Sequence, residues 1–171
     1  DHAAKAVAAD PVLAEVVAGE WRSDEAKARD RYRHPVESLT FWGLQPGMTI
    51  LEIQPGGASW WTEILAPYAK RTGGAFYATG PDLDNPELSE GARKARAEFE
   101  ARYGAKPDLY GKVGVVNWGP KSKPLPQASY VNHEPLRRRK WLAHSRESTK
   151  LEGLRSQGHR TLVPLSLYFL G

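Results

Sequence analysis

A carboxylate followed at once by a turn of small residues is the feature of this chain whose residue types best suit chemistry. Small residues let a backbone approach a ligand closely, and an acid at a strand end can anchor a polar group beside it. This pattern fits a cradle for a nucleoside cofactor, while an ordinary strand-to-helix turn stays an open alternative. The candidate cofactor-binding residues here are Glu52, Gln54, Pro55, Gly56, Gly57 and Ala58.

Two other chemistries fit this turn less well. A dinucleotide fold would place glycine at its third position and pyrophosphate at the helix N-terminus, but Trp60 and Trp61 crowd that terminus. The letters GASWW also resemble a nucleophile elbow, G-x-S-x-G, except that tryptophan replaces the last glycine. No assignable histidine and acid partner follow, so we interpret Ser59 as a helix N-cap.

Polar residues after the next two strands are further candidates. Asp82 follows the second strand, where a carboxylate can accept hydrogen bonds from ribose hydroxyls, and Asp84 is the fallback. Asn117 stands near the end of the third strand and could meet an adenine edge. A solvated loop aspartate is an equally open interpretation of Asp82.

The sequence gives little support for a metal site and none for a disulfide. The five histidines show no ligand spacing such as H-E-x-x-H, so we predict no metal site. The absence of cysteine excludes disulfides and thiolate zinc sites and leaves the redox compartment undetermined.

The elements that position these residues alternate between strand and helix. We predict strands over 49–53, 75–79 and 113–118 from their apolar and β-branched content. Trp61, Ile64, Leu65 and Tyr68 share one helical face after the first strand. Such alternation implies right-handed crossovers and a mostly parallel α/β sheet.

Capping signals place the helices. Asp10 before Pro11 and Ser23 before two acids open N-terminal helices, and Pro35 begins another. Asn85 and Pro86 are expected to cap a helix after the second strand. We predict one domain over 1–171: N-terminal helices over 1–44, a β/α cofactor-binding core over 45–120 and a divergent basic C-terminal segment over 121–171.

A long stretch resembles a known family. RYRHPVESLTFWGLQPGMTILEIQPGGASWWTEILAPY is similar to a bacterial family of predicted class I S-adenosylmethionine-dependent methyltransferases, over about residues 20–118. The resemblance implies a Rossmann-like sheet, S-adenosylmethionine as cofactor and methyl transfer to an unidentified acceptor, with no nameable catalytic residue. It also implies Tyr32 and His34 as candidates to face the cofactor or acceptor, and we add Trp60 and Trp61 as candidate walls of the substrate pocket. Relatives often carry export signals, so an exported or periplasmic location and a cytoplasmic one both stay open.

The C-terminal third departs from that family. The tail is truncated, frame-shifted or a genuine divergent ending, and the sequence does not choose among these. Loss of the family's fourth strand would expose an edge of the first strand and leave the sheet incomplete. We therefore expect residues 161–170 to pair beside residues 49–53.

Charge is concentrated in this last segment. Residues 134–160 hold eight Lys/Arg against three Asp/Glu, and the rest of the chain holds 16 against 17. The alternative function is therefore a degenerate, non-catalytic Rossmann-like domain that binds a nucleotide-like ligand, or a protein or nucleic-acid partner through the basic tail. Nucleic-acid contact through 137–160 is the less favoured prediction. We expect no membrane span, and the sequence does not indicate an oligomeric state.

Overall fold

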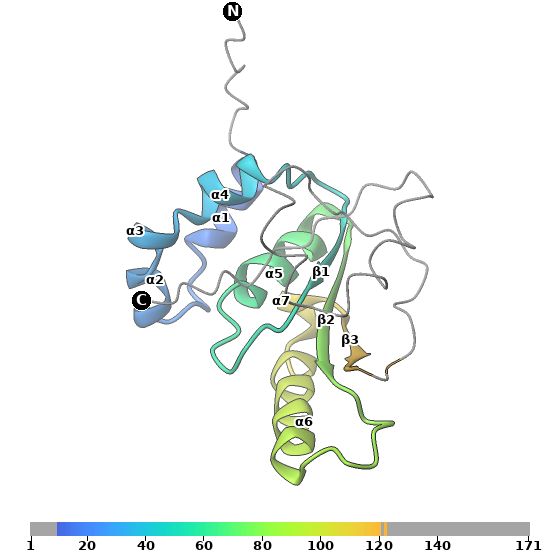
Figure 1. The fold of residues 1–171 in the computed structure, drawn as a ribbon. Coiled ribbons are helices and arrows are strands. Elements are labelled where there is room, and N and C mark those ends of the chain that lie inside the picture. The colour runs from blue at the N-terminus through green and yellow to red at the C-terminus, as the bar shows by residue number, and fades with distance from the viewer. Residues whose placement is uncertain (1–9, 121, 123–171) are drawn as a thin grey trace, which may run out of the picture.

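A three-stranded parallel sheet forms the centre of the described part of the chain. The structure is a computed structural model that describes residues 10–120 and 122. The strands β1 (Thr49–Glu52), β2 (Ala75–Pro81) and β3 (Val113–Trp118) follow one another in that order across the sheet (Figure 1). Both strand pairs are parallel, with Thr49 opposite Ala75 and Phe76 opposite Val113. The α/β class and the parallel sheet are thus confirmed.

Helices precede the sheet and form part of both crossovers. Four short ones precede β1: α1 (Pro11–Val17), α2 (Asp24–Ala28), α3 (Asp30–Arg33) and α4 (Pro35–Phe41). The crossover from β1 to β2 contains α5 (Thr62–Thr72), and the crossover from β2 to β3 contains α6 (Glu90–Gly104) and α7 (Pro107–Tyr110). Because α5 packs against both α1 and the strands β1 and β2, it lies between the N-terminal helices and the sheet (Figure 1).

Local capping explains where the first helices begin. Asp10 Oδ1 accepts a hydrogen bond from the Val12 amide at 2.9 Å, with proline in the first turn. Ser23 Oγ accepts one from the Ala26 amide at 3.2 Å. Both predicted N-caps are confirmed.

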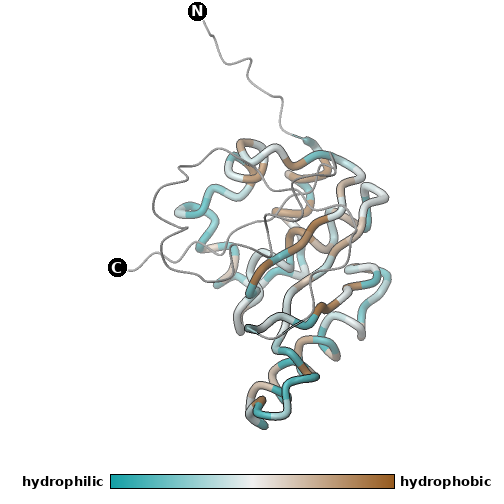
Figure 2. Tube along the Cα trace, turned by 45° about the vertical axis from the view of Figure 1, so that its right-hand side comes forward, coloured by the Kyte–Doolittle hydropathy of each residue, from teal (hydrophilic) through white to brown (hydrophobic). Residues whose placement is uncertain are grey.

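The core forms around α5. Its predicted apolar face is confirmed, because Trp61, Ile64, Leu65 and Tyr68 are all buried. The Tyr68 hydroxyl donates to Asp10 Oδ2 at 2.5 Å and so ties α5 to the start of α1. Figure 2 shows the apolar segments of the trace running through the middle of the described fold.

One prediction of local structure was wrong, and one short helix was not predicted. The helix after β2 begins at Glu90, because Ser89 Oγ caps it by accepting from the Ala92 amide at 3.2 Å. Asn85 instead forms a turn, with its Oδ1 accepting from the Glu87 amide at 3.0 Å. The short helix α7 was not predicted, since four residues carry too little periodicity to detect.

Two further expectations concern the pairing of the C-terminal residues and membrane-spanning helices. The expected pairing of residues 161–170 beside β1 lies outside the described residues. Within the range that the structure describes, no helix is both long and apolar enough to cross a bilayer.

Candidate functional site

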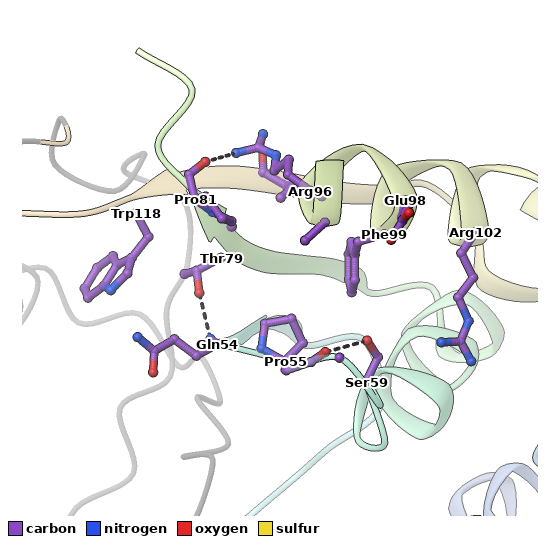
Figure 3. A pocket seen from close by; sticks show the side chains of 15 residues that line it. Gln54, Pro55, Ser59, Thr79, Pro81, Arg96, Glu98, Phe99, Arg102 and Trp118 are labelled. Atoms are coloured by element: carbon purple, nitrogen blue, oxygen red, sulfur yellow. Dashed lines mark hydrogen bonds between the residues drawn. The ribbon is translucent and has the colours of Figure 1, made fainter. Parts of the chain in front are cut away.

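A cavity of about 610 Å³ opens at the carboxyl ends of the strands (Figure 3). The turn after β1, the ends of β2 and β3 and one side of α6 enclose it. In Figure 3, Phe99 points from α6 toward Pro55, and Trp118 and Arg102 stand at opposite ends of the view. Four of the predicted cofactor-binding residues line this cavity: Gln54, Pro55, Gly56 and Gly57.

The turn that forms its floor has an unusual backbone. Gln54, Gly56 and Ser59 all have positive φ, at 53°, 68° and 46°. Two hydrogen bonds hold this shape: the Gln54 amide donates to Thr79 Oγ1 at 2.7 Å, and Ser59 Oγ donates to the Gly56 carbonyl at 3.0 Å. A Cβ built on Gly56 or Gly57 would meet nothing within 4 Å, so the turn borders open space.

Ser59 therefore does not cap a helix as predicted. The N-cap of α5 is Trp61, which makes no capping hydrogen bond with its side chain. Ser59 is buried, and its hydroxyl closes the turn instead.

Glu52 lies beneath the turn and does not line the cavity. Its side chain is 1% exposed, and Thr62 Oγ1 donates to its Oε2 at 2.6 Å. Within the described part of the chain, Oε1 has no hydrogen-bond partner. Burial raises the pKa of Glu52 from its ordinary 4.5 to about 7, and the hydrogen bond from Thr62 opposes part of that rise. Near neutral pH this carboxyl therefore exists in both protonation states.

Asp82 and Asn117 are already engaged by protein groups. Asp82 is buried, and its Oδ1 accepts from the Asp84 amide at 3.0 Å. Asn117 Oδ1 accepts from Arg96 Nη1 at 2.7 Å, and its Nδ2 donates to Asp84 Oδ2 at 3.3 Å. Neither Asp82 nor Asn117 lines the cavity.

Arg96 is a site residue that sequence reasoning missed. It is buried on α6, and its guanidinium donates to the carbonyls of Pro81 at 2.9 Å and Val115 at 3.1 Å. Arg96 therefore fastens α6 to the ends of β2 and β3. Arg96 lies four residues after Ala92 and three before Phe99, and this helical spacing from two apolar residues was the available signal.

The other predicted residues lie away from the cavity. Trp60 and Trp61 are buried in the core with ring centroids 4.6 Å apart, and Trp60 Nε1 donates to the Ala26 carbonyl at 2.8 Å. Tyr32 and His34 are exposed on the N-terminal helices. The structure does not bring these four pocket candidates together at the cavity, and Ala58 is exposed beside it without lining it.

The fold and the site together define an α/β domain with a cavity at the carboxyl edge of a parallel sheet. Residues 110–171 match the family described as SmpB protein. The "SsrA-binding protein" of Corynebacterium diphtheriae is 54% identical over 43 residues, which are 25% of this chain and 26% of that protein. Those of Synechococcus sp. and Mycolicibacterium gilvum are 56% identical over 43 residues, with the same coverage. No solved structure matches.

These similarities correct the main functional prediction. The chain spans about a quarter of the length of the curated relatives it matches. The family found is SmpB and the relatives are SsrA-binding proteins, so the resemblance to class I methyltransferases and the predicted methyl transfer were wrong. The matched range includes the basic C-terminal segment, which departs from the methyltransferase family. The alternative, a partner bound through that segment, is favoured instead.

Proposed function

We propose that this chain binds RNA through residues 110–171, with SsrA RNA as the first candidate. The observation that carries the proposal is the match of this range to the SmpB family, together with identities of 54% and 56% to SsrA-binding proteins. Local charge supports it, because residues 134–160 hold eight Lys/Arg against three Asp/Glu. Lysine and arginine bind phosphates and release condensed counterions, which favours nucleic-acid binding.

The proposed RNA-binding range begins at Tyr110, the last residue of α7, and includes the strand β3. The strand β3 belongs to both the α/β fold and the matched residues 110–171. It pairs with β2 from Phe76 opposite Val113 to Pro81 opposite Trp118, and Arg96 donates to its Val115 carbonyl and Asn117 side chain. The start of the matched range is therefore held rigidly by the rest of the fold.

Binding of RNA by the full chain tests this proposal. We expect fluorescence anisotropy to show saturable binding of SsrA RNA that is tighter than binding of a shuffled RNA of equal length. The affinity should fall as salt rises, with log K linear in log salt. Equal affinity for both RNAs, or no salt dependence, contradicts the proposal.

A matched pair of variants locates the contact. Replacing Arg137, Arg138 and Arg139 by glutamine should reduce the salt slope by roughly 0.7 for each lost phosphate contact, or about 2 in all. The control removes three exposed charges from the α/β fold, with Lys70, Lys94 and Lys106 replaced by glutamine. Its slope should stay near that of the unaltered chain. Equal effects of the two triple variants would locate the binding elsewhere.

A second candidate function is binding of a nucleoside-type ligand in the cavity. A volume of about 610 Å³ lies within the usual size of small-molecule sites. The aromatic side chains of Phe99 and Trp118 supply surfaces for a base, and the open turn at Gly56 and Gly57 lets a ligand approach the backbone. That this ligand is S-adenosylmethionine stays a prediction. That the sheet belongs to a Rossmann-like fold also stays a prediction.

Calorimetric titration with adenosine, S-adenosylmethionine and its demethylated product tests this candidate. Gly57→Leu extends a side chain into the open space beside the turn and should abolish any binding. Gly91→Leu is the matched control, because a Cβ there also meets nothing within 4 Å and Gly91 does not line the cavity. If none of the three compounds binds the unaltered chain, this candidate is wrong.

An RNA partner also bears on the cellular compartment of the protein. Of the two compartments expected from the sequence, RNA binding favours the cytoplasm over export. The division into one domain over 1–171 stays a prediction.

A further inference from the structure

The short helix α3 carries an exposed aromatic ring among arginines. Tyr32 is 71% exposed, and the guanidinium carbon of Arg31 lies 4.5 Å from the centroid of its ring. Arg29 and Arg33 are exposed on either side of them in the chain. We name these four residues, Arg29, Arg31, Tyr32 and Arg33, the arginine–tyrosine face.

The positive charges of this face are crowded together. The one acid within α3, Asp30, is bound by Arg22 through two hydrogen bonds of 2.7 and 2.8 Å. None of the three arginines of the face takes part in an ion pair within residues 10–120 and 122. Burial, and then repulsion from Arg29, lower the pKa of Arg33. An anion placed between these guanidinium groups would relieve that repulsion.

The face stands on a fixed base. Arg22 is buried beneath α3, and its guanidinium lies 5.1 Å from the centroid of the Trp60 ring. Arg33 lies 4.7 Å from the same ring, which the hydrogen bond to Ala26 holds in place. His34, at φ 43°, ends the helix after one turn. Because these contacts hold the base of the face, ligand binding has to order mainly its exposed side chains.

We infer that the arginine–tyrosine face is a second RNA contact, taking a single-stranded segment. A guanidinium group can donate two parallel hydrogen bonds to the oxygens of one phosphate. An exposed tyrosine ring can stack on an unpaired base. A base in a duplex is already stacked and offers no free face to Tyr32, so single-stranded RNA is the occupant that fits. The inference rests on the proposed RNA binding and adds a contact outside residues 110–171.

Two single substitutions separate the stacking contribution from the charge contribution. Tyr32→Ala removes a base stack and should weaken binding of single-stranded RNA about tenfold, without changing the salt slope. Arg31→Gln should reduce the slope by roughly 0.7. The control is Phe41→Ala, because Phe41 is also an aromatic residue 71% exposed, but on α4. It should leave both affinity and slope unchanged.

The experiment uses the full chain, labelled SsrA RNA and a labelled single-stranded oligouridine, with a duplex RNA for comparison. If Tyr32→Ala binds SsrA RNA and the oligouridine as tightly as the unaltered chain does, the inference is wrong while the proposed function stands. An equal loss in Phe41→Ala, or preference for the duplex, also overturns it. If the unaltered chain binds no RNA, both the proposed function and this inference fall.

Photo-crosslinking supplies a readout that does not depend on any variant folding. An oligouridine that carries 4-thiouridine should crosslink to the peptide containing residues 29–33 of the unaltered chain. Crosslinks confined to peptides from residues 110–171 would overturn the inference and leave the proposed function intact.

Discussion

Replacing Glu52 by glutamine should remove a large part of the pH dependence of stability. Burial raises the pKa of Glu52 from 4.5 to about 7, so the folded state holds the proton more tightly than the unfolded chain does. The resulting stabilisation is fully present below about pH 4.5 and is lost as pH rises through about 7. At about 1.4 kcal/mol for each pKa unit, the whole effect is about 3 kcal/mol.

Most of this loss falls within an accessible pH window. Between about pH 5 and about pH 8 the unaltered chain should lose roughly 2.5 kcal/mol of unfolding free energy through Glu52 alone, because part of the effect lies below that window. Glutamine keeps an oxygen that accepts from Thr62, and it does not ionise. Any fixed cost of burying its amide is the same at every pH, so it cancels in the difference between the two pH values.

Urea unfolding followed by tryptophan fluorescence measures this difference. The pH dependence of Glu52→Gln should be flatter than that of the unaltered chain by about 2.5 kcal/mol across the window. Glu20→Gln, at an exposed position, should change nothing. Thr62→Val removes the hydrogen bond that favours the ionised carboxylate, so it should move the transition to higher pH. Parallel curves for Glu52→Gln and the unaltered chain would refute the reasoning.

Three further substitutions test particular contacts. Arg96→Met removes the hydrogen bonds to the carbonyls of Pro81 and Val115 and should cost roughly 3 kcal/mol in urea unfolding, whereas Lys94→Met, on the exposed side of α6, should cost little. Gly74→Ala should destabilise by about 1–3 kcal/mol or prevent folding, because its Cβ would lie too close to a backbone carbonyl oxygen just before β1. Gly56→Ala should cost roughly 1–2 kcal/mol through its φ of 68° alone, since its Cβ would meet only open space. Gly57→Ala has neither problem and is the control for both glycine variants; an equal cost there would contradict these two predictions.

Much of the local structure was predictable because its causes are local. The cap at Asp10 acts two residues away and the cap at Ser23 three residues away, so a short window of sequence contains the whole interaction. The strand over 113–118 was predicted with the bounds that the structure has, because β-branched residues dominate it. Periodicity and capping report such short-range physics well.

The site was less predictable because its contacts join distant residues. The partner of Glu52 lies ten residues away, and Trp60 binds the carbonyl of Ala26, 34 residues earlier. Neither spacing leaves a pattern in the sequence. The positive φ of Ser59 likewise depends on how the turn closes over Gly56, so a helix cap was the natural but wrong prediction.

The main functional prediction was wrong for a different reason. The resemblance drawn from the sequence covered residues 20–118, whereas the family match covers residues 110–171. The eight Lys/Arg against three Asp/Glu over 134–160 were the available signal. Charge alone does not distinguish an RNA-binding segment from a solvated surface, and so this signal was given too little weight.

Trp118 connects the cavity with the residues that match SmpB, so it could couple the two proposed binding events. This side chain lines the cavity and also lies within the residues that match SmpB. A small molecule and an RNA that both favour one orientation of this indole would be coupled thermodynamically. Each would then alter the dissociation constant of the other by the same factor, whichever bound first.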